Sequence, residues 1–356
     1  MTKKTDLRHI GMVMLVLCTA LIMTVLPAAA YYTADKPLVT NATGTVTGGM
    51  NYTIGDSYYS PKMWSNDTYV YTVSLPNAIP ITSDVHKRRL YVYWTWSFND
   101  TSPGGAYDTS VNATMNVDFN GEANFNEPHA SYVDLKYDNL LNTDDGYYNY
   151  PSGTYVYDIP NVADGPYTVN ITNTYGAAYN QSFNIQAVGL LALYNTSGGN
   201  TSHYWIDEGC DLTYTAWKNT TNSWIYGFTP DDAVSLAKFT GVNTANVSSA
   251  KLITCVPAGD TPYNRLYVNY FFNYPAWQNI KYWNGLWNKN PYEDFSWAET
   301  EVKDNLIDGT NYVGFQNGLY TMIPHPYNKP DPYQEGMLYQ EKQMEAANAF
   351  LLLTYN

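Results

Sequence analysis

From residue 31 onward, the chain reads as short runs of alternating apolar and polar residues separated by glycine, proline, asparagine and aspartate. Alternation with a period of two places one face of a strand in a core and the other face in solvent. Two runs, "AVGLLALY" (187–194) and "NAFLLLTY" (348–355), are apolar at almost every position, which indicates central strands buried on both faces. Because no βαβ alternation is visible, the pattern predicts an all-β fold of antiparallel strands.

Helical periodicity is scarce, and we expect only a few short helices. The strongest helix signal lies in "TPDDAVSLAKFTG" (229–241). Thr229 suits an N-cap, Pro230 suits the first helical position, and Gly241 suits the residue beyond the end. A second segment, "YQEKQMEAANAF" (339–350), holds helix-forming residues but runs into the last strand.

Landmarks recur in the same order in two parts of the chain, which indicates an internal duplication. Each copy is long enough to enclose one core, so the repeat predicts two tandem antiparallel β-sandwich domains. The paired landmarks are "YVYTVSLP" (69–76) with "SAKLITCVP" (249–257), "RLYVYW" (89–94) with "RLYVNY" (265–270), "FNG" (119–121) with "WNG" (283–285), "YDIPNVADGPYTVNITN" (157–173) with "TEVKDNLIDGTNYVGFQN" (300–317), and the two closing apolar runs.

The N-terminus carries the pattern of a secretory signal peptide. A basic region is followed by the apolar stretch 10–26 and by "PAAA" (27–30), a small-residue cleavage site before Tyr31. A retained membrane anchor is the alternative, since the apolar stretch approaches the length needed to span a bilayer. The closing run at 349–353 is far too short to span one, so we expect a secreted protein without a membrane anchor after cleavage.

These signals divide the chain into five expected parts. The boundaries are a signal peptide at 1–30, an N-terminal arm or strand at 31–60, a first β-sandwich repeat at 61–194, a connecting segment at 195–230 and a second β-sandwich repeat at 231–356.

Charge and cysteine content narrow the partners and the compartment. The chain has 32 Asp and Glu against 18 Lys and Arg, a net charge of −14, which repels nucleic acid and anionic lipid. Beyond the signal peptide lie two cysteines, Cys210 and Cys255. Export to an oxidising space favours one disulfide between them; two buried free thiols, or pairing between chains, are the alternatives.

The chain holds eleven N-x-S/T sequons, all before residue 250. They predict a glycosylated outer face on the first two-thirds of the protein, with the second copy partly covered by neighbours. Abundant Asn and Thr in turns is the alternative explanation. The acceptor residues would be Asn41, Asn51, Asn66, Asn99, Asn112, Asn170, Asn180, Asn195, Asn200, Asn219 and Asn246.

The sequence supplies no catalytic constellation, and we do not expect an enzyme. Ser57 sits in "GDSYYS", but no G-x-S-x-G or C-terminal Asp-x-x-His accompanies it. Asp207 and Glu208 in "YWIDEGCD" could form half of a glycosidase pair, although adjacent loop acids are usually solvated. The histidines lack metal-ligand spacing, so we expect no cofactor. Calcium at the acid pairs Asp144-Asp145 or Asp231-Asp232 is a weak alternative, and the metal ligands are unknown. The histidines beyond the signal peptide are His86, His129, His203 and His325.

The tryptophans offer a second functional interpretation. Trp94 and Trp96 in "WTW" have the same parity, and "WNGLW" (283–287) holds two more tryptophans. Exposed aromatic rings on a sandwich can stack on sugars, whereas buried rings contribute to a core, which the large apolar area of tryptophan favours. A secreted adhesin or carbohydrate-binding protein is therefore the alternative function.

The order "RLYVYWTW", an Asp-Gly turn with an alternating strand, "AVGLLALY" and "YWIDEGCD" resembles a secreted β-rich domain family of methanogenic archaea. The likeness covers roughly 40–355, and "YWIDEGCD" followed by "NAFLLLTY" is its most specific part. The resemblance implies a cell-surface protein and no catalytic residues. Members often carry a C-terminal anchor or further domains, and this sequence shows neither, so it looks like a subunit of the proteinaceous sheath that some filamentous methanogens build.

Taken together, these features predict a structural subunit of an archaeal sheath or surface layer. Its partners would be copies of itself, in a homopolymer, and other envelope proteins. Tyrosine-rich contacts and unpaired strand edges would join the copies, because an exposed edge can pair with the backbone of another chain.

Overall fold

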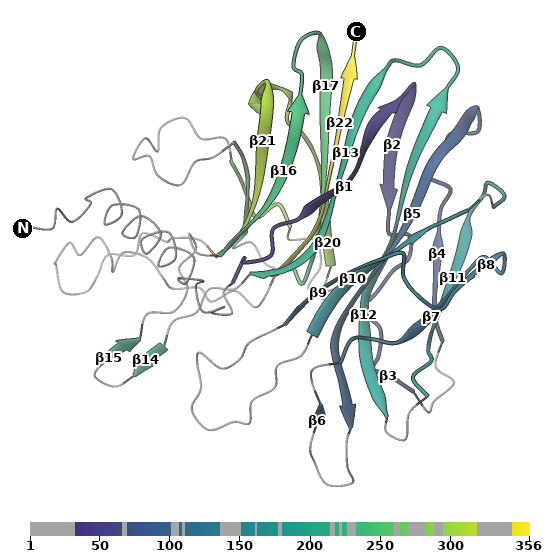
Figure 1. Cartoon of the computed structure of the whole chain (residues 1–356), viewed down its shortest axis with the longest axis vertical. Helices are drawn as coiled ribbons and strands as arrows, with labels where there is room; N and C mark the ends of the chain where they lie inside the picture. Colours follow the sequence, from purple (N-terminus) through teal and green to yellow (C-terminus); the bar gives the residue numbers. More distant parts are fainter. Residues whose placement is uncertain are drawn as a thin grey trace, which may run out of the picture. The chain divides into compact units, whose positions relative to one another are not determined.

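A computed structural model describes residues 33–65, 70–100, 107–108, 111–135, 151–160, 162–176, 180–213, 218–220, 223–225, 233–259, 264–269, 282–287, 295–318 and 344–356. The regular structure within these ranges is almost entirely antiparallel strand (Figure 1). Within the same ranges, the only helix is a single 3-10 turn, η2, at Lys303–Asn305. The all-β fold expected from the alternating pattern is therefore confirmed.

The first sandwich packs an outer sheet on an inner sheet. Its strands are β2 (Gly48–Thr53), β3 (Met63–Trp64), β4 (Val70–Leu75), β5 (Ser83–Asp100), β6 (Tyr107–Asp108), β7 (Met115–Phe119), β8 (Ala123–Phe125), β9 (Ala130–Leu135), β10 (Pro151–Asp158), β11 (Tyr167–Asn173) and β12 (Gln181–Thr196). The first outer sheet has the order β4-β11-β7-β8 and the first inner sheet β2-β12-β5-β10-β9, with β3 and β6 at its margin. Trp94, Phe119 and Phe183 are among the buried side chains between the two sheets.

The second sandwich repeats this arrangement. Its strands are β1 (Val39–Val46), β13 (Ser202–Thr213), β16 (Val234–Val242), β17 (Val247–Pro257), β18 (Asn264–Val268), β19 (Tyr282–Asn284), β20 (Phe295–Glu301), β21 (Gly309–Asn317) and β22 (Met344–Tyr355), while β14 (Lys218–Thr220) and β15 (Ser223–Ile225) pair only with each other. The second inner sheet has the order β1-β13-β22-β17-β20 and the second outer sheet β16-β21-β18-β19. Trp205, Trp287 and Phe315 lie in the core between them.

The strand order supports the internal duplication but corrects its register. Successive strands along the chain enter the outer and inner sheets in the same order in both sandwiches. The strands β4, β5, β7, β8, β10, β11 and β12 of the first sandwich therefore correspond, one by one, to β16, β17, β18, β19, β20, β21 and β22 of the second. The match of 157–173 with 300–317 and the match of the closing strands agree with this correspondence. The "RLYV" match is wrong, because residues 89–92 lie on inner strand β5 and residues 265–268 on outer strand β18. Two further pairings also join non-equivalent strands. "YVYTVSLP" lies on outer strand β4 and "SAKLITCVP" on inner strand β17, whereas "FNG" ends β7 and "WNG" ends β19, both in outer sheets.

A third core joins the two sandwiches. The inner sheets face each other through buried apolar side chains, so the described strands form four layers in the order outer, inner, inner, outer. Tyr91 and Leu191 come from the first inner sheet, and Ile206, Ile253 and Phe350 from the second. The closing strands β12 and β22 are buried along most of their length, as their continuous apolar runs predicted.

The N-terminal segment and the expected connecting segment both belong to these sheets. Consecutive strands β1 and β2 pair with β13 in the second inner sheet and β12 in the first, so residues 39–53 contribute an edge to each. Residues 202–213, which the sequence assigned to a connection, form β13 beside β22. The signal peptide at 1–30 lies outside the described residues.

The two helix signals are corrected. Residues 234–242 form β16, which pairs with β21, and Met344 begins the strand β22. In β16, Val234, Ala237 and Phe239 are buried in the second sandwich. Pairing with β21 and burial in a core outweigh the local preference for helix, because helix propensity is worth only a few tenths of a kcal/mol per residue.

Candidate functional site

Strand β5 directs charged and aromatic side chains toward the second inner sheet. Side chains alternate along a strand, so Leu90 and Val92 enter the core of the first sandwich, whereas Tyr91 and Tyr93 face the other way. Arg89 has the same parity as these tyrosines and is 1% exposed. A guanidinium at this depth requires ionic partners, since burying an unpaired charge is very costly.

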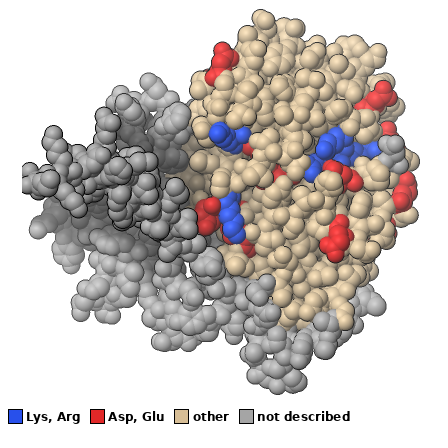
Figure 2. All heavy atoms as spheres, in the orientation of Figure 1, with Lys and Arg blue, Asp and Glu red and all other residues tan. Residues whose placement is uncertain are grey.

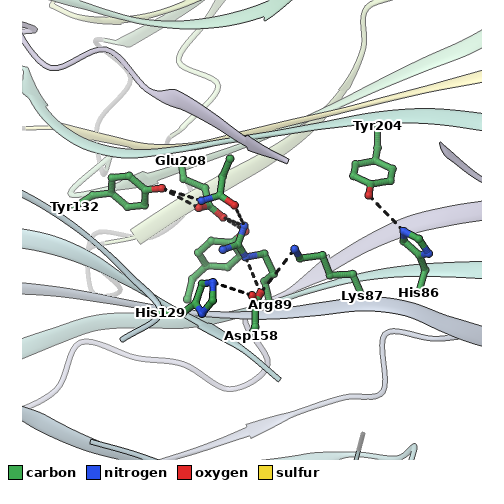
Figure 3. Close-up of polar contacts among 10 residues, drawn as sticks. His86, Lys87, Arg89, His129, Tyr132, Asp158, Tyr204 and Glu208 are labelled. Carbon is green, nitrogen blue, oxygen red and sulfur yellow. Dashed lines mark hydrogen bonds and ion pairs between the residues drawn. The ribbon is translucent and has the colours of Figure 1, made fainter. Parts of the chain in front are cut away.

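The main partner of Arg89 is Glu208 on β13, which is 0% exposed. The distance between Arg89 Nη1 and Glu208 Oε1 is 3.0 Å, and Nη1 also donates to Asn41 Oδ1 at 2.6 Å. The hydroxyls of Tyr91 and Tyr132 donate to Glu208 Oε1 at 2.8 Å and Oε2 at 3.1 Å, respectively. Figure 3 shows Glu208 between Tyr132 and Arg89. The ion pair thus connects the two inner sheets.

The other side of Arg89 leads toward solvent. Arg89 Nε lies 3.2 Å from Asp158 Oδ1, and the Asp158 side chain is 37% exposed. His129 Nε2 lies 3.2 Å from Asp158 Oδ2, and Lys87 Nζ lies 3.9 Å from Oδ1, as Figure 3 also shows. The network therefore runs from a buried carboxylate through a buried guanidinium to a partly exposed carboxylate at the surface.

Burial changes the proton affinity of the acids on β13. Desolvation raises the pKa of Glu208 above its ordinary value, and Arg89, Tyr91 and Tyr132 act in the opposite direction. Burial also raises the pKa of Asp207 to about 6, although the backbone N–H of Lys238 donates to its Oδ2 at 2.9 Å. Asp207 and Glu208 are adjacent, so their side chains enter different layers.

A second polar chain crosses the interface between the inner sheets beside the ion pair. The hydroxyls of Tyr52 and Tyr93 are 2.9 Å apart, and Tyr93 also donates to Asn348 Oδ1 at 2.6 Å. Cys255 lies next to both tyrosines, and burial raises its pKa to about 12. Polar groups on β2, β5, β17 and β22 are thus matched to each other inside an otherwise apolar layer.

Arg89, Glu208 and the hydroxyls of Tyr91 and Tyr93 are enclosed between sheets rather than presented at an open surface. Their partners come from strands of both sandwiches. This arrangement fixes the register of the two inner sheets against each other, because any relative shift would leave a buried charge without its partner.

The two cysteines do not form the expected disulfide. Cys210 on β13 and Cys255 on β17 are both free and buried. Strand β22 lies between β13 and β17. Strands are about 4.8 Å apart, so cysteines on the two flanking strands are separated by roughly 9–10 Å, beyond the roughly 7 Å Cα separation that a disulfide can bridge. The alternative of two buried free thiols describes this structure.

The sequons differ in accessibility. Asn41, Asn112, Asn200 and Asn246 are exposed, and Asn51, Asn170, Asn180 and Asn195 are half-buried, whereas Asn66 and the Asn219 side chain lie outside the described residues. Asn99 is 6% exposed, and its Nδ2 donates to the Tyr175 hydroxyl at 2.9 Å. Asn99 is therefore poorly accessible in the folded chain, and its glycosylation, like that of the other sequons, stays a prediction.

The candidate catalytic residues are not brought together. Ser57 Oγ lies within hydrogen-bond distance of the carbonyl oxygens of Ile54 and Val188, at 2.6 and 2.9 Å, which fixes a loop. His203 stacks on Trp205 with ring centroids 4.1 Å apart, and the His86 ring contacts the Tyr204 hydroxyl at 3.3 Å. Outside the described residues lie His325 and the acid pairs at 144–145 and 231–232.

The aromatic residues of the proposed sugar-binding faces contribute to cores. Trp94 and Trp287 are 0% exposed, and Trp287 stacks on Phe315 with ring centroids 5.3 Å apart. Trp96 has a positive φ of 57° at an irregular point of β5, so parity along the strand does not place it on the face of Trp94. Of the tryptophan side chains that the structure describes, none is exposed.

Sequence reasoning did not identify the Arg89–Glu208 pair. Two signals were available: an Arg-Arg step immediately before an apolar strand, and acids inside the apolar segment "YWIDEGCD". Charged residues within a strand that is otherwise buried call for partners of opposite charge. The neighbouring Arg88 follows the same rule on the opposite face, where it pairs with Asp164.

Comparisons with known proteins identify a family. The model of a family described as "Protein of unknown function (DUF3344)" matches residues 31–354. None of the curated proteins matches the chain. A solved structure described as a "putative secreted protein" from Parabacteroides distasonis ATCC 8503 is 8% identical, with a TM-score of 0.17, over 91% of this chain and 99% of that chain. Within the described residues, no helix has the length and apolar character needed to cross a membrane.

Proposed function

The chain belongs to the DUF3344 family of proteins of unknown function, and we propose that it is a secreted structural subunit that assembles with copies of itself into a sheath or surface layer. The signal-peptide pattern at 1–30 supports export. The observation that carries the proposal is the open edge of β4.

The backbone of β4 offers hydrogen-bonding groups away from its partner β11. The Asp56 N–H donates to the Ser74 carbonyl at 3.2 Å, and the Ser74 N–H donates to Asp56 Oδ1 at 2.6 Å, so the Ser74 backbone points away from β11 and is covered there by Asp56. Backbone groups alternate along an edge strand, so those of Thr72 point the same way. Within the described part of the chain, nothing hydrogen-bonds to the Thr72 backbone from that side.

The corresponding strand of the second sandwich, β16, has a covered edge. The Leu38 N–H donates to the Leu236 carbonyl at 2.8 Å, and the Lys238 N–H donates to Asp207 Oδ2 at 2.9 Å. Trp205 Nε1 donates to the Thr240 carbonyl at 2.9 Å. The duplication thus has one covered edge, on β16, and one edge, on β4, that stays open at Thr72, where a strand of another copy can add.

Apart from the cover that Asp56 gives Ser74, the edge of β4 lacks the usual protection against pairing. Strand β4, "VYTVSL", contains no charged residue and no proline, which are the devices that commonly block edge-to-edge association. Figure 2 shows one face of the molecule on which Lys, Arg, Asp and Glu occupy a few separate places, while most of the described surface carries neither charge. Close approach of copies therefore costs little desolvation of charge at such surfaces.

A substitution on β4 tests the proposal. Thr72→Pro removes an N–H that faces outward and leaves the ladder with β11 intact. We expect wild-type protein to form ordered polymers as concentration rises, and Thr72→Pro to remain monomeric with an unchanged circular dichroism spectrum. The matched control Thr72→Val keeps the N–H and should polymerise. Sedimentation velocity and electron microscopy give the readout; wild-type protein that stays monomeric, or Thr72→Pro that polymerises equally well, contradicts the proposal.

A further inference from the structure

Three aspartates meet where the N-terminal segment passes the two inner sheets. Asp35 precedes β1, Asp134 lies on β9 and Asp211 on β13. Each offers a carboxylate oxygen, and these oxygens lie within 4.8 Å of one another. Asp35 is exposed, whereas Asp134 is 6% and Asp211 is 0% exposed. The cluster therefore has a solvent side and a buried side.

Among the described residues, one cation faces these three acids, Lys36. Lys36 Nζ lies 2.6 Å from Asp134 Oδ1 and donates to the Val133 carbonyl at 3.1 Å, and the Lys36 side chain is 47% exposed. The backbone N–H groups of Leu135 and Leu212 each donate to Asp134, at 2.8 Å. Asp134 is thus well satisfied, but a single ammonium leaves the cluster with surplus negative charge.

The buried side of the cluster holds oxygens without a hydrogen-bond donor. Asp211 Oδ1 accepts the Lys36 N–H at 3.2 Å, while Asp211 Oδ2 has no hydrogen-bond partner among the described residues. The Ser235 hydroxyl on β16 is 0% exposed and lies close enough to the Asp211 carboxylate to lower its pKa, but it makes no hydrogen bond of normal geometry with a described residue. Burial has the larger effect on Asp211 and raises its pKa to about 7. A buried carboxylate oxygen without a hydrogen-bond partner needs an explanation, and a bound ion is one that also balances the surplus negative charge of the cluster.

We propose that Asp35, Asp134 and Asp211 bind a calcium ion, with Asp211 Oδ2 as the buried ligand and the Ser235 hydroxyl beside it. Calcium accepts six to eight oxygen ligands in flexible geometry, so water on the exposed side of Asp35 can complete its shell. The ion neutralises the surplus charge and connects the N-terminal segment, the first inner sheet and the second inner sheet. The site is independent of the assembly function proposed above.

Calorimetric titration of CaCl2 into the full chain after removal of divalent ions tests this site. We expect one bound ion per chain and a rise in Tm that grows with calcium concentration, because a ligand that binds only the folded state stabilises it. Asp211→Asn should weaken binding at least tenfold. Asp304→Asn, at an exposed aspartate in η2, is the matched control and should bind as wild type.

A second variant keeps the test decisive if Asp211→Asn fails to fold. Lys36→Gln removes the competing ammonium from a half-exposed position, and we expect it to bind calcium several-fold more tightly. The proposal is overturned by absence of binding up to about 10 mM calcium, which exceeds the weakest affinities of extracellular calcium modules. Equal affinity in Asp211→Asn, or unchanged or weaker affinity in Lys36→Gln, overturns it as well.

Discussion

Replacing Arg89 by methionine is the sharpest probe of the buried network. Methionine keeps much of the apolar stem but removes the guanidinium, so Glu208 stays at 0% exposure without its cation. Its two tyrosine hydrogen bonds remain, and these can hold a neutral carboxyl group as well as a carboxylate. We expect Glu208 in this variant to take up a proton on folding.

The cost follows from the proton equilibrium. Protonating a carboxyl group of ordinary pKa 4.5 at pH 7 costs about 3 kcal/mol, at 1.36 kcal/mol per pH unit. At pH 5 the same step costs about 1 kcal/mol or less. Removing one partner of a buried ion pair typically costs about 3–5 kcal/mol, so the two estimates agree at neutral pH. The loss should therefore be about 3 kcal/mol at pH 7 and much smaller at pH 5.

Urea unfolding followed by tryptophan fluorescence measures these free energies. The double variant Arg89→Met with Glu208→Gln should recover most of the stability, since the amide oxygen can accept from one of the two tyrosine hydroxyls and the amide N–H can donate to the oxygen of the other. Glu208→Gln alone leaves Arg89 with Asp158 as a partly exposed partner and should cost less than Arg89→Met. A loss below about 1 kcal/mol for Arg89→Met at pH 7, or an equal loss at both pH values, refutes the reasoning.

Three further predictions follow from single sites. The folded pKa of Asp207, about 6, exceeds its ordinary value of 3.8, so its contribution to stability is fully present below pH 4 and is lost as pH rises through 6. Asp207→Asn should therefore reduce the change with pH of the free energy of unfolding in urea between pH 4 and 7. Gly153→Ala should lower Tm by several degrees, because a Cβ at this position would lie within 3 Å of the Trp94 ring. In the control Gly121→Ala, the new Cβ would contact no atom, although the positive φ of Gly121 adds a smaller strain. Cys210 and Cys255 should not react with maleimide in the native protein but should react in urea without reductant, which the masses of their peptides would show. A peptide mass that corresponds to the two cysteines joined by a disulfide would contradict the free thiols.

The sequence predicted the fold correctly where the local pattern agrees with the tertiary environment. Alternation and the apolar closing runs correctly indicated antiparallel strands and two central strands, because the residues on each face of a strand are apolar where that face is buried and polar where it meets solvent. The 229–241 segment was misread because its N-cap and proline are local signals, and pairing of β16 with β21 overrides them. The recurring "RLYV" misled for a related reason: buried strands in non-equivalent sheets favour the same residue types.

The candidate site was mostly beyond reach of the sequence. Arg89 and Glu208 lie far apart in the chain, and only packing of the two inner sheets brings them together. The cysteine pairing was wrong because nothing in the spacing of Cys210 and Cys255 reveals that β22 lies between their strands. Likewise, the sequence does not show that Asp35, Asp134 and Asp211 come together, because only the folded strands bring their carboxylate oxygens within 4.8 Å of one another.

The assembly proposal is tested most directly in the cell envelope of the source organism. Envelopes would be extracted in hot detergent with and without reductant, and the insoluble fraction identified by mass and imaged by electron microscopy. The account predicts that this chain dominates an ordered, detergent-resistant layer that survives reductant, since both of its thiols are buried and free. Recovery of the chain as a soluble monomer in the extract would contradict the account.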